Sequence, residues 1–339
     1  MLQAFTIEDF LRLSHPILDV RSPREFARGH IPGAVNLPLF TDDERAAVGT
    51  TYKRDGRDAA VLEGLRAVGP RLSAMVERAT EIAPDRNVRL HCWRGGERSG
   101  SVGWLLDKAG FGEVVTLRKG YKGFRSYVQK GFSAPLRLRV LGGYTGTGKT
   151  ETLGHLKALG AQVIDLEALA NHKGSSFGAI GENPQPSTEH FENLLWHALQ
   201  PMDPDKPVWV EDESLMIGRV KIPDAFFNTL RDAPLAFAEM PIEQRADRLV
   251  KDYGKYPIED LSAATKRIEK RMGPQHCKAA LDALAAGDLR TTALLTLKYY
   301  DKAYTFGAAK RAADRVKHFP VNANDLRGLA ERLMEHERS

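Results

Sequence analysis

The part of this sequence best suited to covalent chemistry is a cysteine followed by a glycine-rich loop, an arginine and a helix. Cys92 comes two residues after the strand predicted at 88–90, and Arg98 follows six residues later. Apolar residues then recur at helical spacing as far as Gly110, so a helix should begin just after the loop. The start of that helix and the charge of Arg98 both favour a thiolate, and loop N–H groups would bind a tetrahedral oxyanion. We therefore predict a nucleophilic sulfur next to an anion-binding loop.

The spacing Cys-x5-Arg occurs in two classes of enzyme. The stretch from His91 to Ser99 matches the His-Cys-x5-Arg-Ser signature of cysteine phosphatases. It is also similar to rhodanese sulfurtransferases, whose loop is ordinarily one residue shorter but is longer in some relatives. The alternative is that Cys92 is a buried structural cysteine in a Gly-Gly turn. In that case the spacing to Arg98 and the helix that follows would be coincidental. In either enzyme the predicted catalytic residues are Cys92 and Arg98, and the anion loop consists of Trp93, Arg94, Gly95, Gly96, Glu97 and Ser99.

The length and composition indicate a globular protein of two domains. A chain of 339 residues can bury two cores, and 42% hydrophobic and 27% charged residues are ordinary for such a protein. Acidic residues stand near the N-terminus where a signal peptide needs basic ones, and no apolar run has membrane-spanning length. Two cysteines, Cys92 and Cys277, make neither a disulfide framework nor a Cys-x-x-Cys metal site. We therefore expect a cytoplasmic protein without a membrane partner.

A basic stretch without acidic residues runs from 114 to 150, although the net charge of the whole chain is only +5. Tyr121, Phe124, Tyr127 and Phe132 are interleaved with its basic residues. This composition is typical of a surface that binds phosphates and stacks bases. The alternative is a solvated linker with some aromatic side chains in a core. The basic residues predicted to contact nucleic acid are Arg118, Lys119, Lys122, Arg125, Lys130, Arg137 and Arg139.

The segment before the cysteine is similar to the start of the rhodanese fold. A short apolar strand ends in Asp19-Val20-Arg21, and a Gly-His-Ile-Pro-Gly-Ala turn then leads to Asn-Leu-Pro. We expect Asp19 and Arg21 to hold loops near the cysteine rather than to catalyse. Dual-specificity cysteine phosphatases share this fold, so both enzyme classes remain open. A strand at 114–117 closes the domain, which we place at residues 1–133.

A phosphate loop with the pattern Gly-x4-Gly-Lys-Thr follows an apolar strand at 138–141. Its glycines would let backbone N–H groups surround a diphosphate, Lys149 would reach the phosphate oxygens, and Thr150 could hold Mg²⁺. Leucines at helical spacing after the loop give the strand–loop–helix context that the motif needs. The predicted phosphate-binding residues are Gly143, Tyr144, Thr145, Gly146, Thr147, Gly148, Lys149 and Thr150.

Further apolar strands alternate with helices and predict a parallel sheet. These strands are expected at 162–166, 207–210 and 235–238. Glu211 and Glu213 follow the second of them, where a phosphate-loop protein carries the acidic residues of its metal side. The chain should be helical from 258 onward. The predicted fold class is therefore α/β, with the rhodanese-like domain followed by a P-loop NTPase-like domain at 134–339 that has a helical C-terminal part.

Joined in one chain, these two domains resemble the tRNA 2-selenouridine synthase family. Three further stretches fit that family, namely NHKGSSFG at 171–178, FEN at 191–193, and Glu-x-Glu-Ser at 211–214. The resemblance covers nearly the whole chain, and the pairing of domains is far more specific than either motif. Two residues depart from the family pattern: His91 stands where an aromatic such as Tyr is expected, and Asp212 breaks the acidic pair.

The resemblance implies replacement of sulfur by selenium at C2 of a wobble 2-thiouridine in tRNA, with selenophosphate as the donor. The family also attaches a geranyl group from geranyl diphosphate to that sulfur, which makes the sulfur a better leaving group. Cys92 would then be the catalytic cysteine, its loop and Arg98 would hold selenophosphate or a cysteine-bound selenium, and the phosphate loop would hold the diphosphate. Both compounds would be co-substrates, no permanent cofactor is implied, and an enzyme that supplies selenophosphate is an expected partner.

Two other functions are compatible with these residues. A cysteine phosphatase fused to a kinase-like phosphate-loop domain would act on aryl phosphates without RNA, and His91 completes its signature. A nucleotide-regulated RNA-binding module would bind tRNA and would not need Cys92.

Overall fold

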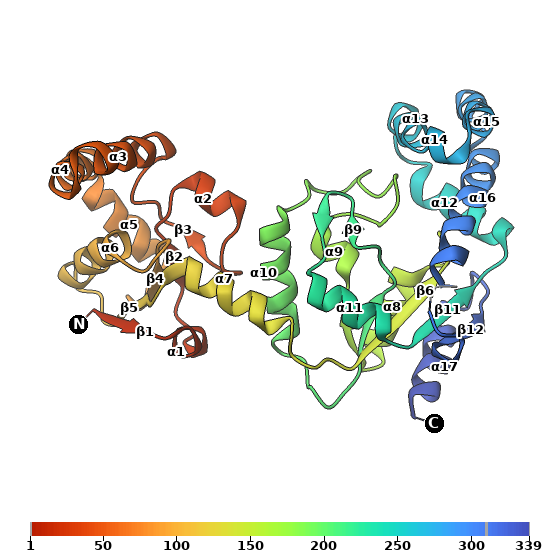
Figure 1. Cartoon of the computed structure of the whole chain (residues 1–339), viewed down its shortest axis with the longest axis horizontal. Coiled ribbons are helices and arrows are strands. Elements are labelled where there is room, and N and C mark those ends of the chain that lie inside the picture. Colours follow the sequence, from red (N-terminus) through yellow and green to blue (C-terminus); the bar gives the residue numbers. More distant parts are fainter. Residues whose placement is uncertain (1, 309–310, 339) are drawn as a thin grey trace. The chain divides into compact units, whose positions relative to one another are not determined.

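The computed structural model describes residues 2–308 and 311–338, which form two compact units (Figure 1). The first unit lies within residues 1–131 and includes Glu192–Leu194, and the second comprises the rest. Each unit is built on a five-stranded parallel sheet with helices, which confirms the predicted α/β fold class. Among the described residues, no helix combines the length and the apolar character needed to cross a membrane.

The sheet of the first unit has the order β1-β5-β4-β2-β3, and all neighbouring strands are parallel. Its strands are β1 (Gln3–Phe5), β2 (Ile17–Asp19), β3 (Val35–Asn36), β4 (Val88–His91) and β5 (Val114–Leu117). Its helices are α1 (Ile7–Arg12), α2 (Pro23–Arg28), α3 (Asp42–Asp55), α4 (Arg57–Val68), η1 (Gly69–Arg71), α5 (Leu72–Ile82), α6 (Glu97–Lys108) and α7 (Gly120–Gly131). All residues of β2, β4 and β5 are buried, as expected for a parallel sheet covered on both faces.

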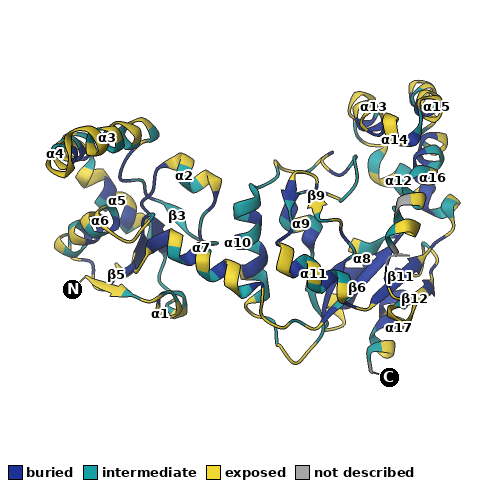
Figure 2. Ribbon diagram, in the orientation of Figure 1, coloured by how far each residue is buried: buried dark blue, intermediate teal, exposed yellow. Residues whose placement is uncertain are grey.

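The core of the first unit follows from the alternation of side chains along its strands. Leu18, Leu90 and Val114 lie in one apolar cluster with Met75 of α5 and Val102 of α6. Helices α3 and α4 are far more exposed than the central strands, and none of the residues of α3 is buried (Figure 2). The core therefore holds the end of β4 in place, where the cysteine loop begins.

The sheet of the second unit has the order β12-β11-β6-β8-β7, again with parallel neighbours. Its strands are β6 (Leu138–Gly143), β7 (Gln162–Ile164), β8 (Val208–Glu211), β11 (Leu235–Glu239) and β12 (Val316–Pro320), and β9 (Met216–Ile217) with β10 (Val220–Lys221) forms a separate antiparallel pair. The helices beside this sheet are α8 (Lys149–Ala158), α9 (Leu166–Ala170), α10 (Thr188–Leu199), α11 (Asp224–Asp232), η2 (Ala313–Arg315) and α17 (Leu326–Arg338).

The C-terminal part of the second unit is a group of helices. They are α12 (Ile242–Tyr253), α13 (Ile258–Arg267), α14 (Glu269–Met272), α15 (Pro274–Ala285) and α16 (Leu289–Ala308). Helix α16 packs against α12 and α15, and α13 packs against α15. Leu261 and Leu284 lie in the small apolar core of this group, together with Ile180.

The strands predicted from apolar runs are all present, but β1, β12 and the short antiparallel pair β9 and β10 escaped prediction. Because β12 is a strand, the expectation of continuous helix from 258 onward is wrong. Strands β1 and β12 lie at the edge of a sheet. In β12 only Phe319 is buried, and the exposed Lys317 and His318 conceal the apolar signal of a strand.

The loop after β4 is fixed by contacts with the first turn of α7 and with the end of β5. The backbone N–H of Tyr121 donates to the carbonyl of Cys92 at 2.8 Å, and that of Lys122 donates to Trp93 at 2.9 Å. Gly95 has a φ of 67°, and a Cβ on it would lie 2.3 Å from the carbonyl oxygen of Leu117. Only glycine fits this close approach of two backbones.

Gly95→Ala should therefore destabilise the first unit, whereas Gly96→Ala should have little effect. A Cβ at Gly96 has no neighbour within 4 Å, and its φ of −118° suits any residue. We expect Gly95→Ala to lower the free energy of unfolding by roughly 2–3 kcal/mol. Thermal or urea unfolding of both variants measures this difference, and equal stabilities would contradict the close packing at Gly95.

Candidate catalytic and phosphate-binding sites

Cys92 lies directly after β4, and only 3% of its surface is exposed. The Ser99 hydroxyl, in the first turn of α6, donates a hydrogen bond to the sulfur at 3.3 Å. Burial alone would raise the pKa of the Cys92 thiol. Hydrogen bonds from the Ser99 hydroxyl and from the backbone N–H groups of Ser99, Gly96 and Arg94 outweigh burial and hold this pKa below its ordinary value. The loop therefore favours the thiolate.

Arg98 forms an ion pair with Glu25 of α2. Its Nη1 lies 2.6 Å from Oε2 of Glu25, and the Arg98 side chain is 16% exposed. Glu25 also accepts the backbone N–H of Ser22 at 3.1 Å, within the capping box of α2. Ser99 and the loop amides are the main groups that lower the pKa of Cys92, while the charge of Arg98 is paired with Glu25. The expected contribution of Arg98 to the thiolate therefore stays a prediction. An anion in the loop would have to compete with Glu25 for this arginine.

The remaining residues of the predicted anion loop form an exposed turn above the buried sulfur. Residues 94–97 are exposed, and Trp93 is half-buried with its ring centroid 5.9 Å from that of Tyr121. The carboxylate of Glu97 forms an exposed ion pair with Arg57 at 2.9 Å. The exposed turn thus covers the thiol, and its N–H groups at Arg94 and Gly96 are directed at the sulfur.

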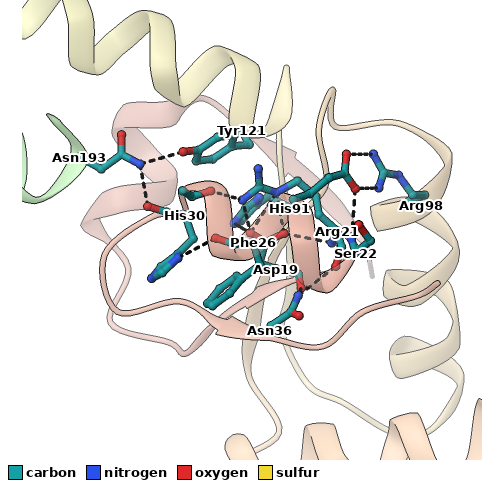
Figure 3. A network of polar contacts seen from close by, with 12 residues as sticks. Asp19, Arg21, Ser22, Phe26, His30, Asn36, His91, Arg98, Tyr121 and Asn193 are labelled. Atoms are coloured by element: carbon teal, nitrogen blue, oxygen red, sulfur yellow. Dashed lines mark hydrogen bonds and ion pairs between the residues drawn. The ribbon is translucent and has the colours of Figure 1, made fainter. Parts of the chain in front are cut away.

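Asp19 and Arg21 belong to a buried network beside the cysteine loop (Figure 3). Arg21 is 1% exposed, and its guanidinium donates to both carboxylate oxygens of Asp19 and to the carbonyl of Gly29 at 2.7 Å. The same guanidinium lies over the ring of Tyr121, 3.7 Å from its centroid. Because the backbone of Tyr121 holds the carbonyl of Cys92, these contacts suit the positioning role expected for Asp19 and Arg21.

His91 is fully buried at the end of β4 and behaves as an aromatic core residue. Neither ring nitrogen has a hydrogen-bond partner among the described residues, and Nε2 lies 3.6 Å from Asp19. Burial is the main cause that lowers the pKa of His91 to about 4, so the ring is neutral at physiological pH. Its ring stacks 6.1 Å from Tyr121, which is consistent with an aromatic side chain at this position.

The predicted phosphate loop lies between β6 and α8. Gly143, Gly146 and Gly148 all have positive φ values, of 141°, 83° and 78°. The loop closes on itself, because the Thr147 hydroxyl donates to the carbonyl of Tyr144 at 2.9 Å. The loop therefore leads into the first N–H groups of a ten-residue helix, an arrangement that binds phosphate oxygens.

Lys149 extends back along the loop, and its Nζ donates to the carbonyl of Gly143 at 3.2 Å. Burial would lower the pKa of this ammonium, but Tyr304, Glu167 and two further carboxyl groups raise it above its ordinary value. Lys149 is therefore charged, with its positive charge held at the loop. The ring of Tyr304 lies 5.3 Å from Nζ.

Three glutamates lie near Lys149 and Thr150. Glu211 is fully buried; its Oε2 accepts the N–H of Leu166 at 3.0 Å, and its Oε1 has no hydrogen-bond partner among the described residues. Glu167, at the start of α9, accepts the Thr150 hydroxyl at 3.2 Å. Burial, reinforced by neighbouring carboxylates, raises the pKa of both Glu211 and Glu213 well above the ordinary range. The sequence had indicated Glu211 and Glu213 but not Glu167.

The described residues contain no group of three or more His, Cys, Asp or Glu side chains arranged to hold a metal ion. The hydroxyl of Thr150 and the unpaired Oε1 of Glu211 are nevertheless hard oxygen ligands of the kind that Mg²⁺ takes. Mg²⁺ usually retains waters and phosphate oxygens, so these donors fit an ion that arrives with a diphosphate rather than a resident metal centre.

Sequence patterns missed three residues beside the phosphate loop. Glu167 could have been found, because it follows the strand β7 and parallel strands end at the same edge of a sheet. Arg245 is 3% exposed, donates to the carbonyl of Thr145 at 3.3 Å, and is paired with Asp301 of α16 at 2.7 Å. Tyr304 also comes from α16, and no local pattern connects that distant helix with the loop.

The basic residues predicted to bind RNA differ in how free their charges are. Arg125 is paired with Glu192 and Arg139 with Glu337, so these two charges are largely neutralised within the protein. The other five are exposed, namely Arg118, Lys119, Lys122, Lys130 and Arg137.

The predicted base-stacking role is wrong for three of the four aromatic residues. Tyr121 and Phe124 are fully buried and Phe132 is 2% exposed, so their rings pack in the core instead. Helical spacing explains this for Tyr121 and Phe124, which lie on the buried face of the amphipathic helix α7, whereas Phe132 follows the end of that helix.

Ser99→Ala should raise the pKa of Cys92, because it removes a hydrogen bond to the sulfur that favours the charged form. The thiolate fraction at neutral pH should therefore fall. Titration of the thiolate ultraviolet absorbance measures this shift when the Cys277→Ala background removes the second thiol. An unchanged titration midpoint would mean that Ser99 has no part in stabilising the thiolate.

Comparisons with known proteins agree with this architecture. Residues 6–127 match the rhodanese-like domain, and residues 136–327 match the tRNA 2-selenouridine synthase AAA domain. A tRNA 2-selenouridine synthase of Sulfurovum sp. is 38% identical, covering 92% of this chain and 93% of that protein. One of Shewanella sediminis is 36% identical over 88% of this chain and 89% of its own length. The chain therefore belongs to the tRNA 2-selenouridine synthase family.

Proposed function

We propose that this protein replaces sulfur by selenium at C2 of wobble 2-thiouridine in tRNA, with selenophosphate as the selenium donor. Membership of the family supports a tRNA-modifying enzyme. The observation that carries the chemistry is a thiolate-favouring loop at Cys92 in a chain that also has a phosphate loop with a charged Lys149. We place the two activities in domains at residues 1–133 and 134–339.

The first chemical step of the proposal is transfer of a geranyl group to tRNA. The 2-thiouridine sulfur attacks C1 of geranyl diphosphate, the C–O bond breaks, and inorganic diphosphate leaves. Residues 143–150 bind that diphosphate through backbone N–H groups, while Lys149 neutralises charge that develops on the leaving oxygen. Mg²⁺ bound to the diphosphate, next to Thr150 and Glu211, would supply further charge neutralisation. The step needs no hydrolysis of ATP.

The second step introduces selenium. The selenium of selenophosphate attacks C2, and the C–S bond breaks so that geranyl thiolate leaves. The Se–P bond must then be cleaved, and the Cys92 thiolate is suited to accept the phosphoryl group before water releases it as phosphate. The loop amides around Cys92 hold the phosphoryl oxygens, and Arg98 joins them once it leaves Glu25. Selenophosphate and geranyl diphosphate are thus co-substrates, no permanent cofactor is required, and an enzyme that makes selenophosphate is the proposed partner for its supply.

Cys92→Ser should abolish 2-selenouridine formation and leave S-geranyl-2-thiouridine formation intact. A serine hydroxyl does not ionise in this loop, whereas the geranyl step uses the phosphate loop. The test incubates purified protein with tRNA containing 2-thiouridine, geranyl diphosphate and selenophosphate, followed by mass spectrometry of nucleosides. Cys277→Ser is the matched control, since Cys277 is buried among α13 and α15 residues and should be inert. Wild-type 2-selenouridine from Cys92→Ser would remove this cysteine from the mechanism.

Replacing Lys119, Lys122 and Lys130 together with Gln should weaken tRNA binding and flatten its salt dependence. These lysines are exposed, and each lost phosphate contact should reduce the slope of log affinity against log salt by about 0.7 to 0.9. Filter binding at several salt concentrations measures both quantities. The matched control replaces Lys266, Lys270 and Lys278, a second basic cluster on α13–α15. Loss of affinity in the control alone would place the tRNA on that cluster instead.

A further inference from the structure

An apolar cavity lies in the second unit, among helices α12, α13, α15 and α16. Its empty volume is about 560 Å³ when the open solvent at its mouth is included. Apolar side chains from four helices line it, including Leu249, Val250, Leu261, Leu284 and Leu289. A cavity of this kind gains affinity by removing apolar ligand surface from water.

Three polar side chains of α16 in the cavity wall are already engaged within the protein, whereas the buried Thr145 hydroxyl has no hydrogen-bond partner among the described residues. The Thr292 hydroxyl donates to the carbonyls of Ala280 and Asp288, both at 3.1 Å. The Thr296 hydroxyl donates to the carbonyl of Thr292 at 3.0 Å, and the Tyr300 hydroxyl accepts the N–H of Ser176 at 3.2 Å. A nucleobase would lose its hydrogen bonds to water here and find few replacements, whereas a hydrocarbon chain loses none.

The wall of the cavity includes one residue of the phosphate loop. Thr145 belongs to both the loop and the cavity wall. Arg245 of α12 donates to the carbonyl of Thr145 at 3.3 Å and is fixed by Asp301 of α16, so two helices of the cavity wall are tied to the loop. A Cβ on Gly146 would lie 3.3 Å from Cγ of Leu249, which shows how closely this wall approaches the loop. The tail of a ligand whose diphosphate is bound by the loop would therefore begin beside this wall.

We propose that this cavity binds the isoprenoid tail of the diphosphate donor, with Val250 and Leu289 helping to set the accepted tail length. The inference rests on the proposed function, because it assigns a place to the tail of the same donor. It also gives a physical reason for a phosphate loop that selects a prenyl diphosphate over a nucleotide: the wall beside the loop offers apolar contact in place of hydrogen bonds.

Isothermal titration calorimetry of the full chain tests the proposal with inorganic diphosphate, geranyl diphosphate, farnesyl diphosphate and ADP. Val250→Phe fills the cavity from α12, and it should weaken geranyl diphosphate by about tenfold or more while leaving inorganic diphosphate unchanged. Val61→Phe is the matched control, since Val61 is 42% exposed on α4 and lies outside the cavity. Leu289→Ala enlarges the cavity and should raise the affinity for farnesyl relative to geranyl diphosphate, a change that general loss of structure would not cause.

The outcomes separate the cavity from the proposed donor. Both cavity variants could bind geranyl and farnesyl diphosphate as tightly as the wild type does, while Lys149→Ala binds both more weakly. That result would support a prenyl diphosphate as the donor and overturn the assignment of its tail to the cavity. If the wild type binds geranyl diphosphate no more tightly than inorganic diphosphate and prefers ADP, the donor itself is wrong. Unchanged affinity of Val250→Phe for inorganic diphosphate shows that the loop is intact, and the tail-length preference of Leu289→Ala tests the proposal should Val250→Phe fail to fold.

Discussion

In the proposed mechanism Cys92 carries negative charge at a position that is only 3% exposed to solvent. Burial opposes this charge, and the opposing contribution comes from one hydroxyl and a few backbone N–H groups of a tight loop. Those groups point at the sulfur only while the loop keeps its shape, which depends on Gly95 against Leu117 and on two backbone hydrogen bonds from the start of α7. The network of Asp19, Arg21 and Tyr121 then holds α7 beside the loop. Much of the first unit thus serves one electrostatic requirement.

The phosphate loop solves the complementary problem of holding positive charge in a buried place. Lys149 remains charged because Tyr304 and several carboxyl groups surround it. The pKa values of Glu167 and Glu213 are raised in turn. A bound diphosphate would add negative charge beside Lys149 and would therefore change the protonation of these carboxyl groups. The apolar cavity beside the loop is consistent with a ligand whose charge lies entirely at one end.

The sequence predicted most of the fold because its signals are local. Apolar runs located the central strands, and glycines with positive φ marked both loops. Edge strands such as β12 were missed because one buried residue carries no periodic signal. The aromatic residues of α7 were misinterpreted because base stacking and core packing use the same residue types, and burial alone separates them.

The candidate sites were predictable only in their motif residues. Cys92 and Lys149 were found from spacing, whereas the partners that set their charge come from distant segments. Glu25 reaches Arg98 across more than seventy residues of sequence, and Tyr304 reaches Lys149 from α16. Such pairings depend on tertiary packing, so composition and spacing cannot reveal them.

The proposed production of 2-selenouridine in tRNA by this chain is tested by mass spectrometry of tRNA nucleosides from selenium-fed cells with and without the gene. We expect 2-selenouridine to disappear on deletion, its 2-thiouridine precursor to remain, and the wild-type gene to restore the modification. An unchanged level of 2-selenouridine in the deletion strain would show that this chain does not make it.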